Sequence, residues 1–456
     1  MASVTFSSLT GGDGSTITDD SDPVTGLDGG GHIYRFVPAL AQTVLQAQSA
    51  VQSAASAQAA AVASQTAKAL AEQAKAGALA ISLNVPTGLP TVKPAALFDF
   101  ANSRSVDPRI TFSRASVELY CDRTGVWRTA AVNEPAIHYD PVTHQCLGLS
   151  AFGGNTNVVL WNRDLTNAAW TKSNCTAALT QTGIDGAANA ASLLTATAAN
   201  ATCLQAITLT SSARFQSAFI KRSAGAGAIS MTMDGGATWV PVTVNTTSFT
   251  RVSIPTQTLA NPSVGFKLAV LGDAIVVDYV QNEDSTFATP PILTTTAAVA
   301  RSAVTITATG TNFSSWFNPT EGTIVAGFAL ASPASPALSN LVRIDDGTDT
   351  NRLMLRCASS QVLLQSITSN TLDCSLTGRT INAFDNVLAA FRYRANDYAL
   401  SINADAILSD TAVVVPSVNQ LRVAAGAIGY PNGYLAHLTY YQSGVTDAEL
   451  QALSTL

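Results

Sequence analysis

The chain has 456 residues, of which 47% are apolar and only 12% are charged. Its net charge of −6 and the lack of any Lys/Arg cluster exclude the phosphate neutralisation that nucleic-acid binding requires. No apolar run is long enough to span a membrane, and the N-terminus has no secretory-signal pattern, so we expect a cytoplasmic product without membrane insertion. The length and the apolar content predict about two to four domains with real cores.

Residues 1–37 combine short apolar runs with glycine-rich turns. This pattern predicts a small irregular β element that is too small to fold as an independent domain. Held in several copies at one end of a rod, such a head would form a docking tip. Its aspartates offer oxygen ligands to a cation, but turn hydrogen bonding is the simpler explanation for them. They are Asp13, Asp19, Asp20, Asp22 and Asp28.

Residues 38–84 form a segment saturated with alanine: 18 of the residues from 39 to 80 are Ala. With Pro38 in the first turn, this composition predicts a long helix. At about 100° per residue, a narrow apolar stripe runs along it and is interrupted by two glutamines. Because a lone helix with so little apolar surface is marginal, we predict parallel self-association, with three chains preferred; a disordered spacer is the alternative. The stripe and its polar layers are Leu40, Val44, Val51, Gln58, Val62 and Gln65.

The rest of the chain is predicted to be mainly β. Residues 85–94 contain three prolines and predict a stiff linker. From residue 95 onward, alternating runs of strand length are separated by Gly, Asn, Asp and Pro. The expected fold is therefore one long N-terminal helix in a trimeric bundle stalk, followed by β-sandwich or jelly-roll domains. The expected parts are a small β connector (95–163), a jelly roll (164–299) and a second β-sandwich (300–456). A capping box at Thr446 and Glu449 predicts the start of a short helix at the end of the second sandwich.

Two runs resemble segments of tailed-bacteriophage fibre and virion proteins: FDFANSRSVDPRITFSRAS from Phe98 and DLTNAAWTK from Asp164. The stretch that ends VDYVQNE resembles the close of a carbohydrate-binding-module-like jelly roll, although Asn282 departs from the family's Gln-Leu-Glu. The last section, with GTIVA from Gly322 and the turn after Asp345, is similar to concanavalin A-like (laminin-G-like) domains at the ends of such fibres. The head, with GGDGST from Gly11 and RFVPALA from Arg35, also resembles tail-fibre N-terminal segments.

This resemblance implies a homotrimeric phage tail fibre. Residues 1–37 would dock to other virion proteins, the helix would trimerise, and the β domains would meet a glycan or protein on the host surface, where avidity multiplies weak binding. The expected location is the virion, after synthesis and assembly in the bacterial cytoplasm. Two alternatives stay open: a purely structural or capsid-decorating fibre without a receptor, and a glycan-degrading tailspike.

No catalytic motif occurs, and we predict that the chain is not an enzyme. None of the four histidines, His32, His138, His144 and His437, stands in a triad or metal-ligand pattern. Phage depolymerases usually resemble parallel β-helices, and the short repeat of that fold is missing. Sugar recognition by a β-sandwich uses exposed aromatic faces. The candidates for it are Tyr430 and Tyr434, which flank a Pro-Asn-Gly turn, and Trp316 and Trp239.

No metal or other cofactor is predicted. Asp345, Asp346 and Asp349 have the oxygen ligands that calcium prefers, and laminin-G-like domains sometimes bind calcium near loop rims. The same residues form an Asp-Gly hairpin turn, which is the favoured explanation. The six cysteines include no C-x-x-C pair and lack a histidine at zinc spacing, so we expect free thiols. They are Cys121, Cys146, Cys175, Cys203, Cys357 and Cys374.

Overall fold

The computed structural model describes residues 2–83, 89–90, 93–334, 339–424 and 429–456, with the backbone alone for residues 33 and 69–83. The chain divides into two compact units, residues 1–86 and 87–456. The predicted fold class, mainly β with one long N-terminal helix, is confirmed. Residues 85–88 and 91–92 of the predicted linker lie outside the described residues.

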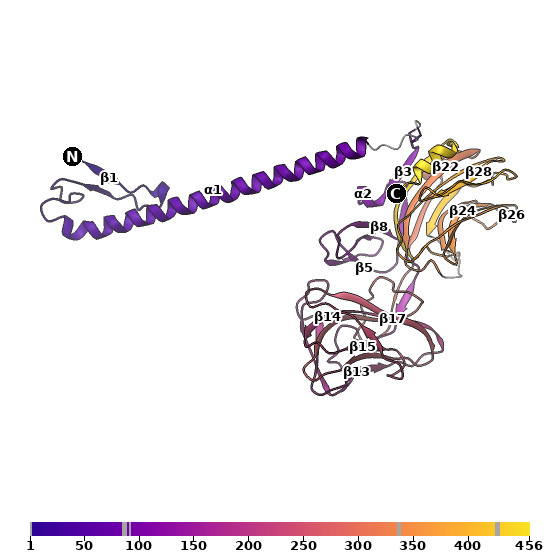
Figure 1. The fold of residues 1–456 in the computed structure, drawn as a ribbon, viewed down its shortest axis with the longest axis horizontal. Helices are drawn as coiled ribbons and strands as arrows, with labels where there is room; N and C mark the ends of the chain where they lie inside the picture. Colours follow the sequence, from indigo (N-terminus) through magenta and orange to yellow (C-terminus); the bar gives the residue numbers. More distant parts are fainter. Residues whose placement is uncertain (1, 84–88, 91–92, 335–338, 425–428) are drawn as a thin grey trace. The chain divides into compact units, whose positions relative to one another are not determined.

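Helix α1 (His32–Leu83) dominates the first unit and is 52 residues long (Figure 1). It begins at His32, well before Pro38, which the sequence placed in the first turn. The backbone turn that ends at Gly31 starts the helix, because the amides of Tyr34 and Arg35 donate to the Gly31 carbonyl at 3.2 and 3.1 Å. Because proline has no backbone N–H, the helix lacks the hydrogen bond that residue 38 would donate to the Tyr34 carbonyl. No helix among the described residues is long and apolar enough to cross a bilayer.

The head folds back along the start of α1. Its antiparallel strands β1 (Ser3–Thr5) and β2 (Thr16–Thr18) and the 3-10 turn η1 (Ser8–Thr10) lie beside the helix (Figure 1). Arg35 holds the head with its guanidinium, which donates to the carbonyl oxygens of Val24 at 2.9 Å and Gly26 at 2.6 Å. The Asp13 amide donates to Gln42 Oε1 at 3.1 Å.

Residues 171–284 form a sandwich of two five-stranded antiparallel sheets, here called the inserted sandwich. Its shared core includes Trp170 and Phe266, whose rings stack at 6.4 Å. The first sheet has the order β10 (Thr171–Ser173), β13 (Ala201–Ala206), β18 (Ser263–Leu268), β15 (Ile229–Thr232), β16 (Val240–Val242). The second has the order β11 (Cys175–Gln181), β12 (Ala191–Ala196), β19 (Ala274–Asp284), β14 (Ser212–Ala224), β17 (Thr250–Leu259).

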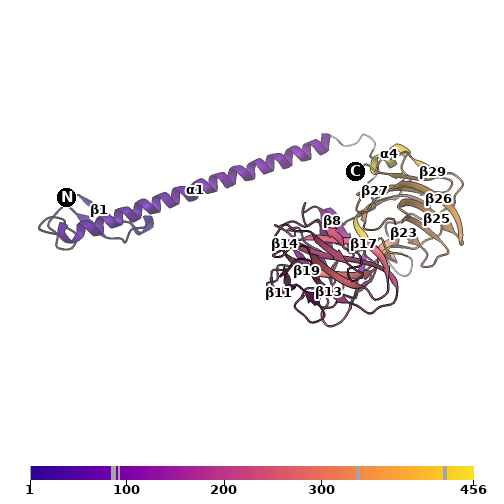
Figure 2. The same cartoon turned by 60° about the horizontal axis from the view of Figure 1, so that its bottom comes forward.

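The second sandwich, here called the C-terminal sandwich, has one seven-stranded and one eight-stranded sheet. The seven-stranded order is β26 (Thr371–Thr380), β25 (Gln361–Thr368), β24 (Arg352–Ala358), β23 (Ser339–Asp345), β30 (Gln420–Ala424), β21 (Thr305–Thr309), β4 (Thr111–Ser113). The other is β29 (Leu408–Asp410), β28 (Tyr398–Ile402), β27 (Val387–Arg394), β22 (Glu321–Leu330), β31 (Gly433–Tyr441), β8 (Cys146–Ser150), β7 (Ile137–Tyr139), with β3 (Ala96–Asp99) also on β31. Figure 2 shows its curved strands.

The sequence assigned residues 95–163 to a separate connector, but four of its strands complete the C-terminal sandwich. Strand β3 pairs with β31, bringing Phe98 opposite Leu438, and β4 pairs with β21. Phe98 belongs to the same buried cluster as Phe391. Gly148, at φ +109°, lets β8 approach β31 so closely that a Cβ there would lie 2.2 Å from the Leu435 carbonyl oxygen. The inserted sandwich therefore interrupts the chain of the C-terminal one.

Short paired segments mark the entrance and exit of the insertion. Strand β9 (Asn155–Asn157) pairs with β20 (Val299–Arg301), so Asn157 lies opposite Val299. The hairpin of β5 (Glu118–Cys121) and β6 (Trp127–Ala130) precedes the insertion. The predicted capping box opens α4 (Asp447–Leu453), whose Leu450 is fully buried. Two short helices, α2 (Phe100–Ser103) and α3 (Thr311–Ser314), complete the unit, and all six cysteines are free thiols.

Candidate functional site

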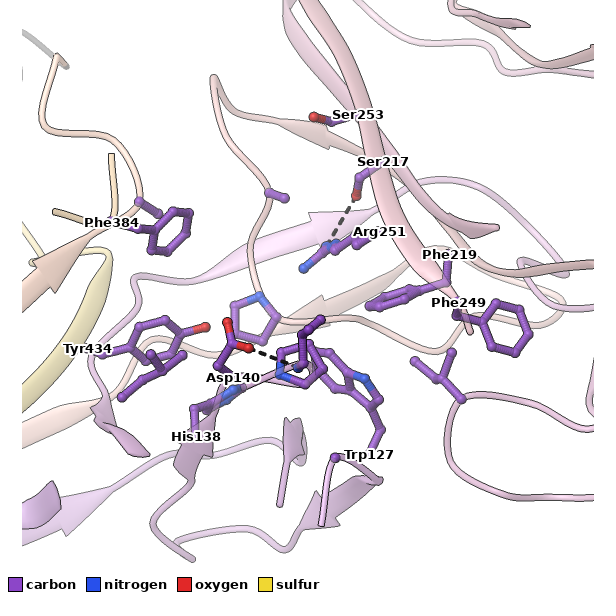
Figure 3. A pocket seen from close by; sticks show the side chains of 18 of the residues that line it. Trp127, His138, Asp140, Ser217, Phe219, Phe249, Arg251, Ser253, Phe384 and Tyr434 are labelled. Carbon is purple, nitrogen blue, oxygen red and sulfur yellow. Dashed lines mark hydrogen bonds between the residues drawn. The ribbon is translucent and has the colours of Figure 1, made fainter. Parts of the chain in front are cut away.

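A cleft of about 920 Å³ opens within the second unit (Figure 3). Its lining comes from the β6–β8 segment, from β14 and β17 of the inserted sandwich, and from the end of the C-terminal sandwich that carries Tyr434. The volume is in the range of small-molecule binding sites. The labelled lining residues are Trp127, His138, Asp140, Ser217, Phe219, Phe249, Arg251, Ser253, Phe384 and Tyr434.

One wall of the cleft is the outer face of strands β14 and β17. Successive side chains on a strand point to opposite faces. On β14, Ala218 and Ile220 enter the core of the inserted sandwich, so the residues between them face the cleft. Cross-strand pairing places Phe219 beside Arg251 and Ser217 beside Ser253. The wall therefore presents Phe215, Ser217, Phe219 and Lys221 from β14. Beside them lie Arg251 and Ser253 from β17 and Phe249, which directly precedes β17.

The opposite wall is aromatic and is centred on Tyr434. The Tyr434 ring lies 5.0 Å from that of His138, 5.5 Å from that of Phe152 and 6.2 Å from that of Phe384, measured between centroids. Figure 3 shows its hydroxyl pointing into the cleft. Among the described residues that hydroxyl has no hydrogen-bond partner. Burial raises the pKa of Tyr434, against the influence of Arg251, so the phenol stays protonated and can donate to a ligand.

Arg251 enters the cleft from the inserted sandwich. One terminal nitrogen donates to Ser217 Oγ at 3.1 Å and to the Thr289 carbonyl at 2.7 Å, and the guanidinium carbon lies 5.4 Å from the Phe219 ring centre. Its Nε is buried without a partner. Burial lowers the pKa of Arg251, while the charge of Glu283 opposes that shift. Burial raises the pKa of Glu283, which is held by hydrogen bonds from Thr289.

Asp140 is the carboxylate that lines the cleft. Its Oδ1 accepts from the amides of Val142 and Thr143 at 2.8 and 2.6 Å. Burial alone would raise the pKa of Asp140, but these two amide hydrogen bonds outweigh it and hold the pKa below its usual value. The carboxylate is therefore charged and is engaged in shaping its own turn.

A buried ion network supports the aromatic wall from behind. Glu118 lies 3.3 Å from Arg301, 3.8 Å from Arg114 and, through Oε1, 3.5 Å from His138 Nε2. Burial alone would raise the pKa of Glu118, yet the close approach of His138 and the two arginine charges lower it to about 2. Arg301 also donates to the Gly153 carbonyl at 2.6 Å. The network thus fixes His138, and with it Tyr434, relative to the end of the insertion.

The structure brings one of the four predicted sugar-binding aromatics, Tyr434, into the cleft. Tyr430 is half-buried outside the lining and packs toward Gly153. Trp316 is a core residue, 3% exposed, whose Nε1 donates to the Asn312 carbonyl at 2.6 Å. Trp239 is half-buried on the first sheet of the inserted sandwich, with the Lys267 ammonium 4.9 Å from its ring centre.

Two of the three calcium candidates, Asp345 and Asp349, pair with arginines. Asp345 is fully buried and accepts from Arg343, from Arg422 Nε at 2.8 Å and from Gln420 Nε2 at 2.8 Å. Asp349 pairs with Arg343 at 2.8 Å. Asp346 accepts from Thr348 and Asn351 within its hairpin turn. No group of three or more metal-binding side chains occurs in the described part of the chain.

The lining offers recognition groups rather than an assembled catalytic pair. Among the described residues, no serine hydroxyl of the cleft hydrogen-bonds to His138 or to a carboxylate. The absence of enzymatic activity stays a prediction. Sequence reasoning missed Ser217, Phe219, Lys221 and Arg251. The available signal was the alternation of aromatic and polar residues on the side of β14 that does not enter the core. Such a period-two pattern separates the two faces of a strand but does not tell which face is covered by another part of the protein.

No protein-family model and no curated protein matches the chain. Among solved structures, the carbohydrate-binding module CBM40 of Ruminococcus gnavus IT-sialidase, bound to α2,6 sialyllactose, is 19% identical, with a TM-score of 0.26, covering 30% of this chain and 84% of that one. Trypanosoma rangeli sialidase is 11% identical, with a TM-score of 0.27, covering 33% and 25% of the two chains.

The receptor-binding domain of botulinum neurotoxin mosaic serotype C/D is 8% identical, with a TM-score of 0.26, covering 33% of this chain and 39% of that one. This chain therefore spans about a quarter of the sialidase and two fifths of the toxin chain. Likeness at this level is partial and carries no argument about what this chain binds.

Proposed function

We propose that this chain is the subunit of a homotrimeric tailed-bacteriophage fibre that attaches to a host-surface glycan. The head docks to the virion, α1 forms the stalk, and the body of residues 95–456 carries the binding cleft. The phage assignment follows from the sequence resemblance. The observation that carries the fibre architecture is the position of the apolar stripe on α1.

The head and the stripe occupy opposite faces of the helix. The head contacts the face of Gln42, and a Cβ on Gly11 would lie 3.0 Å from Ser49 Cβ on that same face. At about 100° per residue, Val44 and Val51 fall about 180° from this face. Every described apolar residue of the stripe is half exposed or more: Leu40 54%, Val44 50%, Val51 69%, Val62 56%. The docked head thus leaves the stripe free for other copies.

A trimer would bury the apolar stripe of α1 and still leave the head accessible. With the stripes of three helices facing one another, apolar side chains leave water and the Gln58 and Gln65 layers set register. The heads then lie outside the bundle, where they can contact another protein. Three bodies at one end would present three clefts to a surface, so weak sites would bind jointly.

The test measures the mass of the full-length protein by sedimentation equilibrium and its binding to an array of bacterial surface polysaccharides. We expect three times the 47.1 kDa chain mass and saturable binding to at least one glycan. A monomer at micromolar concentration would exclude the fibre. A trimer that binds no glycan would favour the structural virion protein, and release of sugar fragments would favour the tailspike.

A further inference from the structure

The cleft has an excess of positive charge. Its lining contains two fixed cations, Lys221 and Arg251, and a single described carboxylate, Asp140. The Lys221 ammonium lies 5.3 Å from the Phe249 ring centre and is held over that face. The Asp140 carboxylate, whose Oδ1 accepts two backbone amides, forms no ion pair with either cation. No described carboxylate forms an ion pair with Lys221 or Arg251, and the buried Glu283 carboxylate acts on Arg251 only at longer range.

Arg251 lacks the ion pairs that two other largely buried arginines of this unit form. Arg163 pairs with Asp185 and Asp278 at 2.8 and 2.7 Å, and Arg392 pairs with Asp397 at 2.6 Å. Arg251 instead has only neutral acceptors, both on one nitrogen. Its Nε is buried without a partner, as are the Nε atoms of Arg392 and of Arg214, a buried arginine outside the cleft lining. Removing a guanidinium from water without an anion is costly. An anionic ligand group entering the cleft would supply the missing partner and would accept from the free donors of the planar fork.

The remaining lining suits a sugar rather than a simple ion. Tyr434 and Trp127 line the cleft with aromatic rings, and the C–H faces of pyranose rings pack against such rings. The Tyr434 hydroxyl and the Ser253 side chain are placed to bond with sugar hydroxyls. Figure 3 shows Arg251 and Tyr434 reaching into the cleft from its two sides. A sugar ring on the aromatic wall would therefore direct its substituents toward the guanidinium.

We propose that the cleft binds an acidic polysaccharide, with sugar rings on the wall around Tyr434 and an anionic substituent, carboxylate or phosphate, on Arg251 and Lys221. This inference rests on the proposed function in glycan attachment and names the chemical class of its ligand. It also assigns charge recognition to the inserted sandwich and ring recognition to the aromatic wall.

The experiment titrates the full-length protein with bacterial polysaccharides in matched forms: native, carboxyl-reduced and dephosphorylated. We expect an acidic polysaccharide to bind most tightly and to lose about tenfold or more in affinity when its anionic group is removed. Whichever treatment abolishes binding identifies carboxylate or phosphate as the group that is read. Equal binding of native and neutralised forms would overturn the inference while leaving glycan attachment intact, whereas the absence of any glycan binding would remove the proposed function itself.

Three variants connect this effect to the cleft. Arg251→Gln should weaken binding of the acidic form about tenfold or more and leave the neutralised form unchanged. Lys221→Gln should produce a smaller loss of the same kind. Because the Lys221 ammonium contacts only the Phe249 ring among the described residues, this variant tests the idea even if Arg251→Gln fails to fold. Arg379→Gln removes the same charge from an exposed site that pairs with Asp405 at 3.7 Å, and should have no effect. Equal losses in all three variants would mean that general charge, not the cleft, attracts the polysaccharide.

Discussion

Glu118 shows how single residues position the site. It is fully buried, and its partners come from three separated segments: Arg114 from the chain before β5, His138 from β7, and Arg301 from β20. A buried carboxylate is stabilising only while its cations remain close. The residue therefore joins the exit of the insertion, through Arg301, to the strand that carries His138, directly behind Tyr434.

Acidification should expose this role. The pKa of Glu118 in the folded protein is about 2, below its ordinary 4.5. The ionised carboxylate therefore adds about 3 kcal/mol to the free energy of unfolding at pH values above 4.5, and this stabilisation is lost as the pH falls toward 2. Glu118→Gln should lower the free energy of unfolding most at about pH 6, and the difference from wild type should shrink toward about pH 2.5. Urea unfolding across this range measures it.

The matched control for this pH effect is Asp284→Asn, which removes the same charge from the exposed end of β19. That variant should change the unfolding free energy by less than about 1 kcal/mol at every pH. A constant difference between Glu118→Gln and wild type, independent of pH, would show that the carboxylate is not held by these cations.

At the scale of elements, the composition of α1 favours a helix, but little of its own chain packs against it. Apart from its contacts with the head, its described side chains are exposed or half exposed along the length of the stripe. Helices of this kind need partners to be stable, since propensity alone gives marginal helicity. The stripe is the surface through which we expect those partners to bind.

A pair of aspartate substitutions tests this surface. Val51→Asp places a charge in the proposed seam, where burial without a partner costs several kcal/mol, and should convert the trimer to monomers at micromolar concentration. Ser53→Asp places the same charge on the face of Gln42 and Gln46, away from the seam, and should leave the trimer intact. Sedimentation equilibrium distinguishes the two, and dissociation of both variants, or of neither, would contradict the assigned seam.

At the scale of the whole molecule, the body is one sandwich inserted into another. Phe98 and Phe100 lie in the core of the C-terminal sandwich, although the inserted sandwich separates them in sequence from the strands that they cover. Strand β31 pairs with β3 and β8 from the segment before the insertion. Residues 300–456 therefore lack part of their own sheet, and the cleft exists only where the two sandwiches meet the β6–β8 segment.

Excision of the insertion should leave a folded protein. Asn157 and Val299 are partners on adjacent strands, so an Asn-Gly turn in place of residues 158–298 closes a two-residue hairpin between them. We expect this deletion variant to unfold cooperatively on heating, as followed by circular dichroism, and to lose glycan binding with the cleft. A fragment of residues 300–456 should not fold, and cooperative unfolding of that fragment would refute the inserted arrangement.

The sequence determined the local features of this protein. Alanine content defined α1, period-two alternation identified the β body, and the Thr446 box located α4, because propensity and capping act between residues close in sequence. The turn at Pro431–Gly433 also singled out Tyr434. Trp316 was wrongly included among the ligand candidates, because a sequence pattern does not distinguish a buried aromatic residue from an exposed one.

Only the tertiary structure decided the position of the insertion and the composition of the cleft. The pairing of β3 with β31 joins Phe98 to Leu438, and no local pattern encodes a partner so distant. Arg251 on β17 and Tyr434 on β31 look unrelated in sequence and meet because separate sheets end at one place. Strand propensity fixes which residues alternate, whereas burial of apolar surface between sheets fixes which strands meet and which side chains line the space between them.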